Sequence, residues 1–137
     1  MKKISHYIPI SFFIFVCFLI VACSGNEGRN IANKPSKGIE FLGRSGCSHS
    51  PTMEKNFVSA LKKAGIENKY KYIDLASLPV DDYRRGYGSP TVLINGEDLF
   101  GMPRPMPITT APVWRMYSGG VPSPESIFNE LSKLNSK

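Results

Sequence analysis

Residues 39–51 are Ile39-Glu40-Phe41-Leu42-Gly43-Arg44-Ser45-Gly46-Cys47-Ser48-His49-Ser50-Pro51, and they place a lone cysteine between an apolar segment and an amphipathic one. The first four residues predict a strand, which a glycine-containing loop ends before Cys47. A helix is predicted next, because Ser50 can act as its N-cap and Pro51 suits its first turn. Gly65 is its expected end. The face that we expect this helix to bury carries Met53, Phe57, Ala60, Leu61 and Ala64.

Two further strands and a short helix are predicted in the middle of the chain. Lys69 to Leu75 alternates and is rich in aromatic and branched residues, which indicates a second strand. Pro79 to Arg85 predicts a short helix. Thr91 to Ile94 predicts a third strand, and Asn95-Gly96 then favours a tight hairpin into a fourth at Asp98-Leu99-Phe100.

A last helix is expected to start near Ser123-Pro124-Glu125, after an irregular proline-rich passage from Gly101 to Pro112. Its expected inward face carries Ile127, Phe128, Leu131 and Leu134. The order strand, helix, strand, helix, hairpin, helix predicts an α/β fold in which helices cover a mixed sheet.

The N-terminal segment has the layout of an export signal. Lys2 and Lys3 precede an uncharged apolar run, Phe12 to Ala22, which ends at Cys23. The ending Leu19-Ile20-Val21-Ala22-Cys23 resembles the lipobox of bacterial lipoproteins. This resemblance implies cleavage of residues 1–22, a diacylglyceryl group on Cys23 and acylation of its new amino group. An uncleaved transmembrane helix is the alternative, but the apolar run is shorter than the roughly 20 residues that a bilayer core requires.

The lipoprotein hypothesis sets the expected domains and location. Residues 23–37 are expected to form a lipidated flexible tether, because they are polar and rich in glycine and asparagine. Residues 38–137 have the length of one domain. We expect the protein in the cell envelope, bound to membrane lipid through Cys23 and on the periplasmic face if the organism is Gram-negative. Ser24 is not the aspartate that many Gram-negative lipoproteins use to stay in the inner membrane, which favours the outer membrane.

Charge and cysteine content narrow the chemistry of the mature chain. Loss of Lys2 and Lys3 lowers the basic count from 17 to fifteen against 11 acidic residues, an excess of +4 that is too small and scattered to favour nucleic acid. Cys17 is expected to leave with the signal and Cys23 to carry lipid, so Cys47 remains the only free thiol. His49 is the only mature histidine, and no metal site is expected. Apart from the lipid, no cofactor is expected.

Cys47-Ser48-His49-Ser50 at a strand-to-helix turn, followed by Ser89-Pro90-Thr91 before the hairpin, resembles the thioredoxin and glutaredoxin superfamily from Ile39 to about Leu134. The resemblance implies a thioredoxin-like fold with a central mixed four-stranded sheet. It also implies that Cys47 is the nucleophile and that Pro90 is a cis-proline lying against it. Ser50 replaces the second cysteine of C-x-x-C, which gives the C-x-x-S form of monothiol members and of some members without redox activity.

The expected chemistry of this motif follows from its position. A thiol at a helix N-terminus faces unpaired N–H groups, so the pKa of Cys47 should be lowered. His49, if protonated, adds a positive charge, and Ser50 can donate a hydrogen bond to the thiolate. The alternatives are that Cys47 is a small buried apolar residue, His49 an ordinary exposed residue, Ser50 only an N-cap, and Pro90 a trans residue of a turn.

A second resemblance covers the C-terminal half. The segments Gly88-Ser89-Pro90-Thr91, Asn95-Gly96-Glu97-Asp98-Leu99-Phe100 and Trp114-Arg115-Met116-Tyr117 resemble small thioredoxin-like proteins that are grouped with alkylmercury lyases. Trp114 stands where that group has a cysteine, and the loss of two of three thiols disfavours mercury chemistry. We take Ser89, Thr91 and Trp114 as candidate substrate-binding residues, with Trp114 as a core residue, a pocket wall or an apolar lid over Cys47.

Three functional hypotheses follow. The first is a membrane-anchored monothiol oxidoreductase whose Cys47 exchanges disulfides with exported proteins or small thiols, and which needs an external thiol as reductant. The second is a non-catalytic binding module that holds a peptide near Pro90 and Trp114. The third is a degenerate relative of organomercurial or metal-resistance proteins.

Overall fold

A computed structural model describes residues 37–67 and 69–134 of the chain. The chain divides into Met1–Ile31 and Ala32–Lys137, and the following description concerns the second unit only. The predicted signal peptide, Cys23 and nearly all of the predicted tether therefore lie outside the described residues. Within the described part, no helix is both long enough and apolar enough to cross a membrane.

The domain is built on a mixed four-stranded open sheet with the strand order β2-β1-β3-β4. Its strands are β1 (Ile39–Gly43), β2 (Lys71–Asp74), β3 (Thr91–Ile94) and β4 (Glu97–Asp98). β1 pairs in parallel with β2 and antiparallel with β3, and β3 pairs antiparallel with β4. The predicted α/β fold with a mixed four-stranded sheet is thus confirmed.

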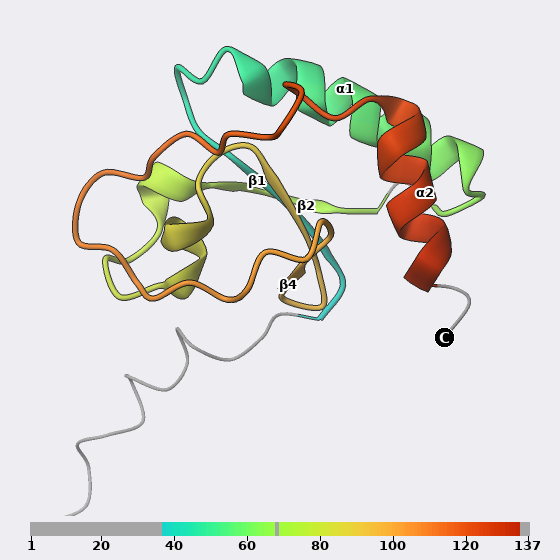
Figure 1. Ribbon diagram of the computed structural model, residues 1–137. Coiled ribbons are helices and arrows are strands. Elements are labelled where there is room, and N and C mark those ends of the chain that lie inside the picture. The colour runs from blue at the N-terminus through green and yellow to red at the C-terminus, as the bar shows by residue number, and fades with distance from the viewer. Residues whose placement is uncertain (1–36, 68, 135–137) are drawn as a thin grey trace, which may run out of the picture. The chain divides into compact units, whose positions relative to one another are not determined.

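Two helices, α1 (His49–Lys63) and α2 (Pro124–Leu134), pack on one face of this sheet (Figure 1). Successive strand residues point to opposite faces, so Phe41 and its partner Val92 face these helices together. The fully buried centre of this core contains Phe41, Met53, Phe57, Ala60, Leu61, Val92 and Ile127. The inward face predicted for α2 is confirmed for Ile127 and Leu131, but Leu134, in the last turn, is 46% exposed.

The opposite face of the sheet is covered by two 3₁₀ helices, η2 (Leu75–Ser77) and η3 (Tyr83–Tyr87). The short helix predicted from Pro79 to Arg85 is displaced to Tyr83–Tyr87. Asp82 is extended and its side chain accepts from the Arg84 N–H, so the helix begins after it and not at Pro79. The core on this face contains Leu42, Ile73, Leu75, Tyr83, Tyr87 and Leu93.

The ends of α1 differ in how well the sequence predicts them. Ser50 is not the N-cap: the helix begins at His49, and Ser50 is its second residue, with a buried side chain. Ser48 occupies the capping position in helical geometry and makes no side-chain cap bond. The predicted end is confirmed, because Gly65 has a φ of 65° and the Ile66 N–H donates to the Leu61 carbonyl at 3.1 Å.

The predicted Asn95-Gly96 turn is confirmed, with positive φ values of 52° and 83°. The fourth strand is displaced from its predicted position and covers Glu97–Asp98 instead of Asp98–Phe100. The reason is the Asp98 carboxylate, which accepts hydrogen bonds from the N–H groups of Phe100 and Met102 and so curls the chain into a turn.

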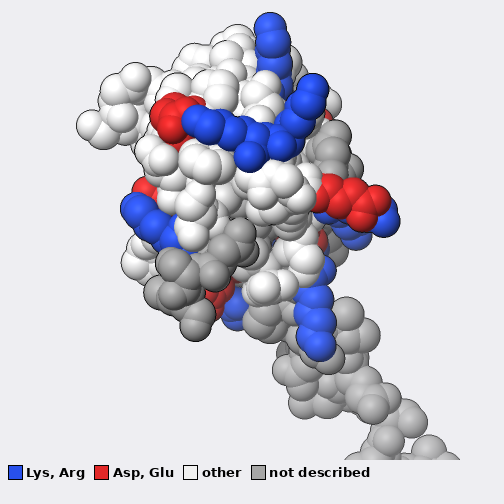
Figure 2. All heavy atoms as spheres, turned by 90° about the vertical axis from the view of Figure 1, so that its right-hand side faces the viewer, with Lys and Arg blue, Asp and Glu red and all other residues white. Residues whose placement is uncertain are grey.

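Charged side chains on the surface are mixed in sign. On the side of the domain drawn in Figure 2, Lys and Arg side chains stand beside Asp and Glu, with uncharged surface between these groups. An exposed ion pair between Lys63 and Glu125 joins α1 to α2.

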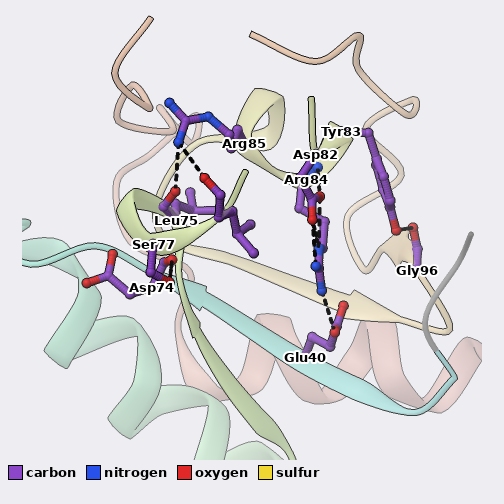
Figure 3. Close-up of polar contacts among 10 residues, drawn as sticks. Glu40, Asp74, Leu75, Ser77, Asp82, Tyr83, Arg84, Arg85 and Gly96 are labelled. Carbon is purple, nitrogen blue, oxygen red and sulfur yellow. Dashed lines mark hydrogen bonds and ion pairs between the residues drawn. The ribbon is translucent and has the colours of Figure 1, made fainter. Parts of the chain in front are cut away.

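A buried ionic cluster ties η3 to the centre of the sheet (Figure 3). Arg84 donates to Glu40 of β1 at 2.9 Å and to Asp82 at 2.6 Å. Both carboxylates are buried, and Asp82 also accepts from the backbone N–H of Arg84 at 2.9 Å. The guanidinium therefore compensates the charge of two buried carboxylates.

Replacing Arg84 by Met should destabilise the domain by about 3 kcal/mol or more, because two buried carboxylates lose their counter-charge. Urea denaturation of the purified domain measures the free energy of unfolding. Lys69→Met is the control, because Lys69 and Glu67 form an exposed pair, and such pairs contribute less than about 1 kcal/mol. Equal losses in the two variants would contradict this account of the cluster.

Candidate functional site

Cys47 lies in the loop that joins β1 to α1, two residues before the first residue of the helix. Its N–H donates to the Arg44 carbonyl at 3.1 Å and its own carbonyl accepts from the Ser50 N–H at 3.3 Å, which fixes the residue at the helix start. Gly46, the residue before Cys47, has a φ of 80°, a backbone conformation that glycine adopts without strain. Cys47 is 6% exposed, and its thiol is free.

The loop before β3 lies against this thiol. The Sγ atom of Cys47 is 3.8 Å from the Ser89 carbonyl oxygen, and the Ser50 and Ser89 hydroxyls share a hydrogen bond of 2.9 Å. The Ser89–Pro90 peptide bond is cis. Cys47, Ser50, Ser89 and Pro90, all predicted site residues, thus come together from two distant parts of the chain.

The pKa of the Cys47 thiol is lowered from its ordinary value. Burial raises this pKa, but hydrogen bonding to the thiolate outweighs burial. The contributing groups are the Ser50 hydroxyl, the backbone of His49, the Ser89 hydroxyl and the backbone of Ser50, in decreasing order. Ser50 therefore acts on the sulfur through its side chain, which the sequence analysis gave as one of two possible roles.

His49 is an exposed first residue of α1, and its hydrogen bond to Cys47 comes from the backbone. His49 lines a pocket of about 40 Å³ together with Pro90, and the other walls come from residues 115–117 and 120–121. His49 therefore borders the same small pocket as the cis-proline.

Trp114 meets the site through its backbone. The Ser89 N–H donates to the Val113 carbonyl at 3.1 Å, and the Arg115 N–H donates to the Ser89 carbonyl at 2.9 Å. The Trp114 side chain is 63% exposed, so the expectation of a core residue is wrong. The chain around it lacks a strand or helix that would pack the indole inward.

Three residues beside the site, Asp98, Arg115 and Tyr117, are not among the predicted site residues. Asp98 is buried and forms a two-armed ion pair with Arg115, and the Tyr117 hydroxyl donates to the Pro90 carbonyl at 3.0 Å. Arg115 and Tyr117 belong to the motif Trp114-Arg115-Met116-Tyr117, so the sequence does point to this segment. Only Trp114 is a predicted site residue there, because Trp114 replaces a cysteine of the resembling group. Thr91, a predicted binding residue, is buried and joins this network through its hydroxyl.

Among residues 37–67 and 69–134, no three His, Cys, Asp or Glu side chains gather as a metal site would require. In the described part of the chain, the reactive groups of the site are the Cys47 thiol and the Ser50 and Ser89 hydroxyls beside it. Such a thiol can act as a nucleophile toward a sulfur or another soft electrophile.

No protein family, curated protein or solved structure matches this chain.

Replacing Ser50 by Ala should raise the pKa of Cys47, because the strongest hydrogen bond that stabilises the thiolate is removed. We expect the midpoint of iodoacetamide alkylation against pH to rise by roughly half a pH unit or more. Ser59→Ala is the matched control, since the Ser59 hydroxyl bonds only to the Lys55 carbonyl on the exposed side of α1. An unchanged midpoint in Ser50→Ala would refute the role of this hydroxyl.

Proposed function

We propose that this chain is a thioredoxin-like, monothiol protein whose Cys47 carries out thiol-disulfide exchange with exported proteins or small thiols. The observation that carries the proposal is the placement of Cys47: a free thiol of lowered pKa at the start of α1, in contact with the loop of a cis-proline. The strand order β2-β1-β3-β4, in which β3 runs antiparallel to the other three strands, agrees with the fold that the sequence resemblance implies.

The exchange is a pair of balanced displacements. The Cys47 thiolate attacks one sulfur of a disulfide, a mixed disulfide forms, and the other sulfur leaves as a thiolate. A second, external thiolate then attacks the mixed disulfide, which releases Cys47 and forms a new disulfide. The partner disulfide is reduced and the external thiol is oxidised, so Cys47 itself is unchanged after a full cycle.

The external thiol is needed because Ser50 occupies the position of the second cysteine. In a C-x-x-C site the second cysteine resolves the mixed disulfide, whereas a hydroxyl cannot. The mixed disulfide of Cys47 is therefore expected to persist until an outside thiol arrives. This persistence is the property that makes the proposal testable.

Incubation of the domain with excess glutathione disulfide should give one covalent adduct per chain, at Cys47. Mass spectrometry under non-reducing conditions measures the adduct, and dithiothreitol should remove it. The Cys47→Ser variant is the control and should stay unmodified. If Cys47 in the folded domain fails to react while it reacts in the urea-unfolded chain, the thiol is structural and the proposal is wrong.

Binding without catalysis is a second candidate function, which the exposed apolar side chains near Ser89 favour. Val113, Trp114 and Met116 are 57%, 63% and 84% exposed on the segment that bonds to Ser89. Isolating the proteins bound to the wild type and to Cys47→Ser would distinguish the two functions. A binding module keeps its partner in Cys47→Ser, whereas a thiol-exchange protein loses the covalent partner in that variant.

We also propose that Cys23 carries the lipid that anchors the protein in the cell envelope, on the sequence pattern alone. Cells fed labelled palmitate should label the wild-type protein and retain it in the membrane fraction. Cys23→Ser should lose the label and stay at the size of the uncleaved precursor, because processing requires the lipidated cysteine. Cys17→Ser is the matched control, and it should be labelled and processed like the wild type.

A further inference from the structure

We propose that Arg115 and Tyr117 are positioning residues that hold the Ser89-Pro90-Thr91 loop against Cys47. The inference rests on the proposed function, since it concerns the reactivity of the same thiol. It assigns a role to two residues that lie 68 and 70 positions after Cys47 in the sequence.

The two residues contact all three members of the loop. The Arg115 N–H donates to the Ser89 carbonyl at 2.9 Å, and the Tyr117 hydroxyl donates to the Pro90 carbonyl at 3.0 Å. The Arg115 guanidinium also donates to the Thr91 hydroxyl at 3.2 Å. One short segment therefore supplies a hydrogen bond to each residue of the loop.

Arg115 is itself firmly held, because its guanidinium forms a two-armed ion pair with the buried Asp98. Asp98 in turn accepts from the N–H groups of Phe100 and Met102 at 3.1 and 2.8 Å. A planar guanidinium bound in this way has little freedom to rotate. The support for the loop thus extends from β4 through Asp98 to Arg115.

Tyr117 is fixed by the same guanidinium, which lies 4.5 Å from the centre of its ring. Burial raises the pKa of Tyr117 to about 12. The phenol therefore keeps its proton throughout the range in which a thiol titrates, and it remains a donor to the Pro90 carbonyl there.

Ser89 transmits this support to the sulfur. Its carbonyl oxygen accepts from the Arg115 N–H and, at 3.8 Å, from the Cys47 thiol, while its hydroxyl bonds to the Ser50 hydroxyl. The bond to the carbonyl needs the thiol proton, whereas the Ser89 and Ser50 hydroxyls favour the thiolate. A loop that moves away from Cys47 would carry the Ser89 hydroxyl with it. We therefore expect loss of the Tyr117 bond to weaken the hydroxyl hydrogen bonding that favours the thiolate.

The test compares Tyr117→Phe with Tyr70→Phe. Tyr70 is a matched control, since its hydroxyl donates to Glu54 at 2.6 Å, burial also raises its pKa to about 12, and it packs against Phe41 and Phe57 in the core. The measurements are the alkylation rate of Cys47 against pH and the free energy of unfolding in urea. The other titratable side chains around the thiol, His49, Tyr72 and Arg44, are the same in both variants.

Tyr117→Phe should raise the alkylation midpoint and lower the rate at neutral pH by about fivefold, as expected for one lost buried hydrogen bond. Tyr70→Phe should leave both unchanged. The same midpoint and rate in the two variants would overturn the positioning role. If Tyr117→Phe unfolds, Arg115→Lys is tested in its place. A lysine keeps the positive charge but cannot bond to Asp98 and Thr91 at the same time. An alkylation midpoint of Arg115→Lys like that of the wild type would then overturn the positioning role.

The outcomes separate this inference from the proposed function. An ordinary thiol midpoint in the wild-type protein contradicts the activated thiolate of the proposed function, whatever the variants do. A low midpoint in the wild type that Tyr117→Phe leaves unchanged contradicts the positioning role alone.

Discussion

The antiparallel pairing of β1 with β3 brings the end of one strand beside the start of the other. Leu42 pairs with Thr91, so the loop that follows β1 and the loop that precedes β3 leave the sheet at the same edge. Cys47 belongs to the first loop and Pro90 to the second. A shift of this register by one residue would also put Phe41 and Val92 on opposite faces of the sheet, so only one of them would face the helices. The hydrophobic core and the site therefore depend on the same pairing.

Three arginines of low exposure hold the irregular parts of the chain around this sheet. Arg84 neutralises Glu40 and Asp82 on the η3 side, and Arg115 pairs with Asp98 on the side of β4. Arg85, the buried one of the three, donates to four backbone carbonyls, two near η2 and two in the proline-rich passage. These acceptors are the carbonyls of Leu75, Leu78, Ile108 and Thr110. A passage without strand or helix is thus fixed by hydrogen bonds from one side chain.

The parts of this structure that sequence predicts best are those with local causes. The strand before Cys47, the end of α1 at Gly65 and the Asn95-Gly96 turn each depend on neighbouring residues, and each is observed. The hydrogen bond between Ser50 and Ser89 joins hydroxyls 39 residues apart, and a serine next to Pro51 resembles an N-cap in any local view. The Arg115–Asp98 pair likewise joins residues whose proximity depends on the whole hairpin. No pattern of composition or spacing specifies such contacts.

The low exposure of Cys47 bears on which sulfur atoms can reach it. A disulfide bond is about 2 Å long and Cys47 is 6% exposed, so a second sulfur must project from its own surface to come this close. A second copy of this chain carries a Cys47 that is covered to the same extent. Self-dimerisation through Cys47 is therefore disfavoured while both loops stay in place.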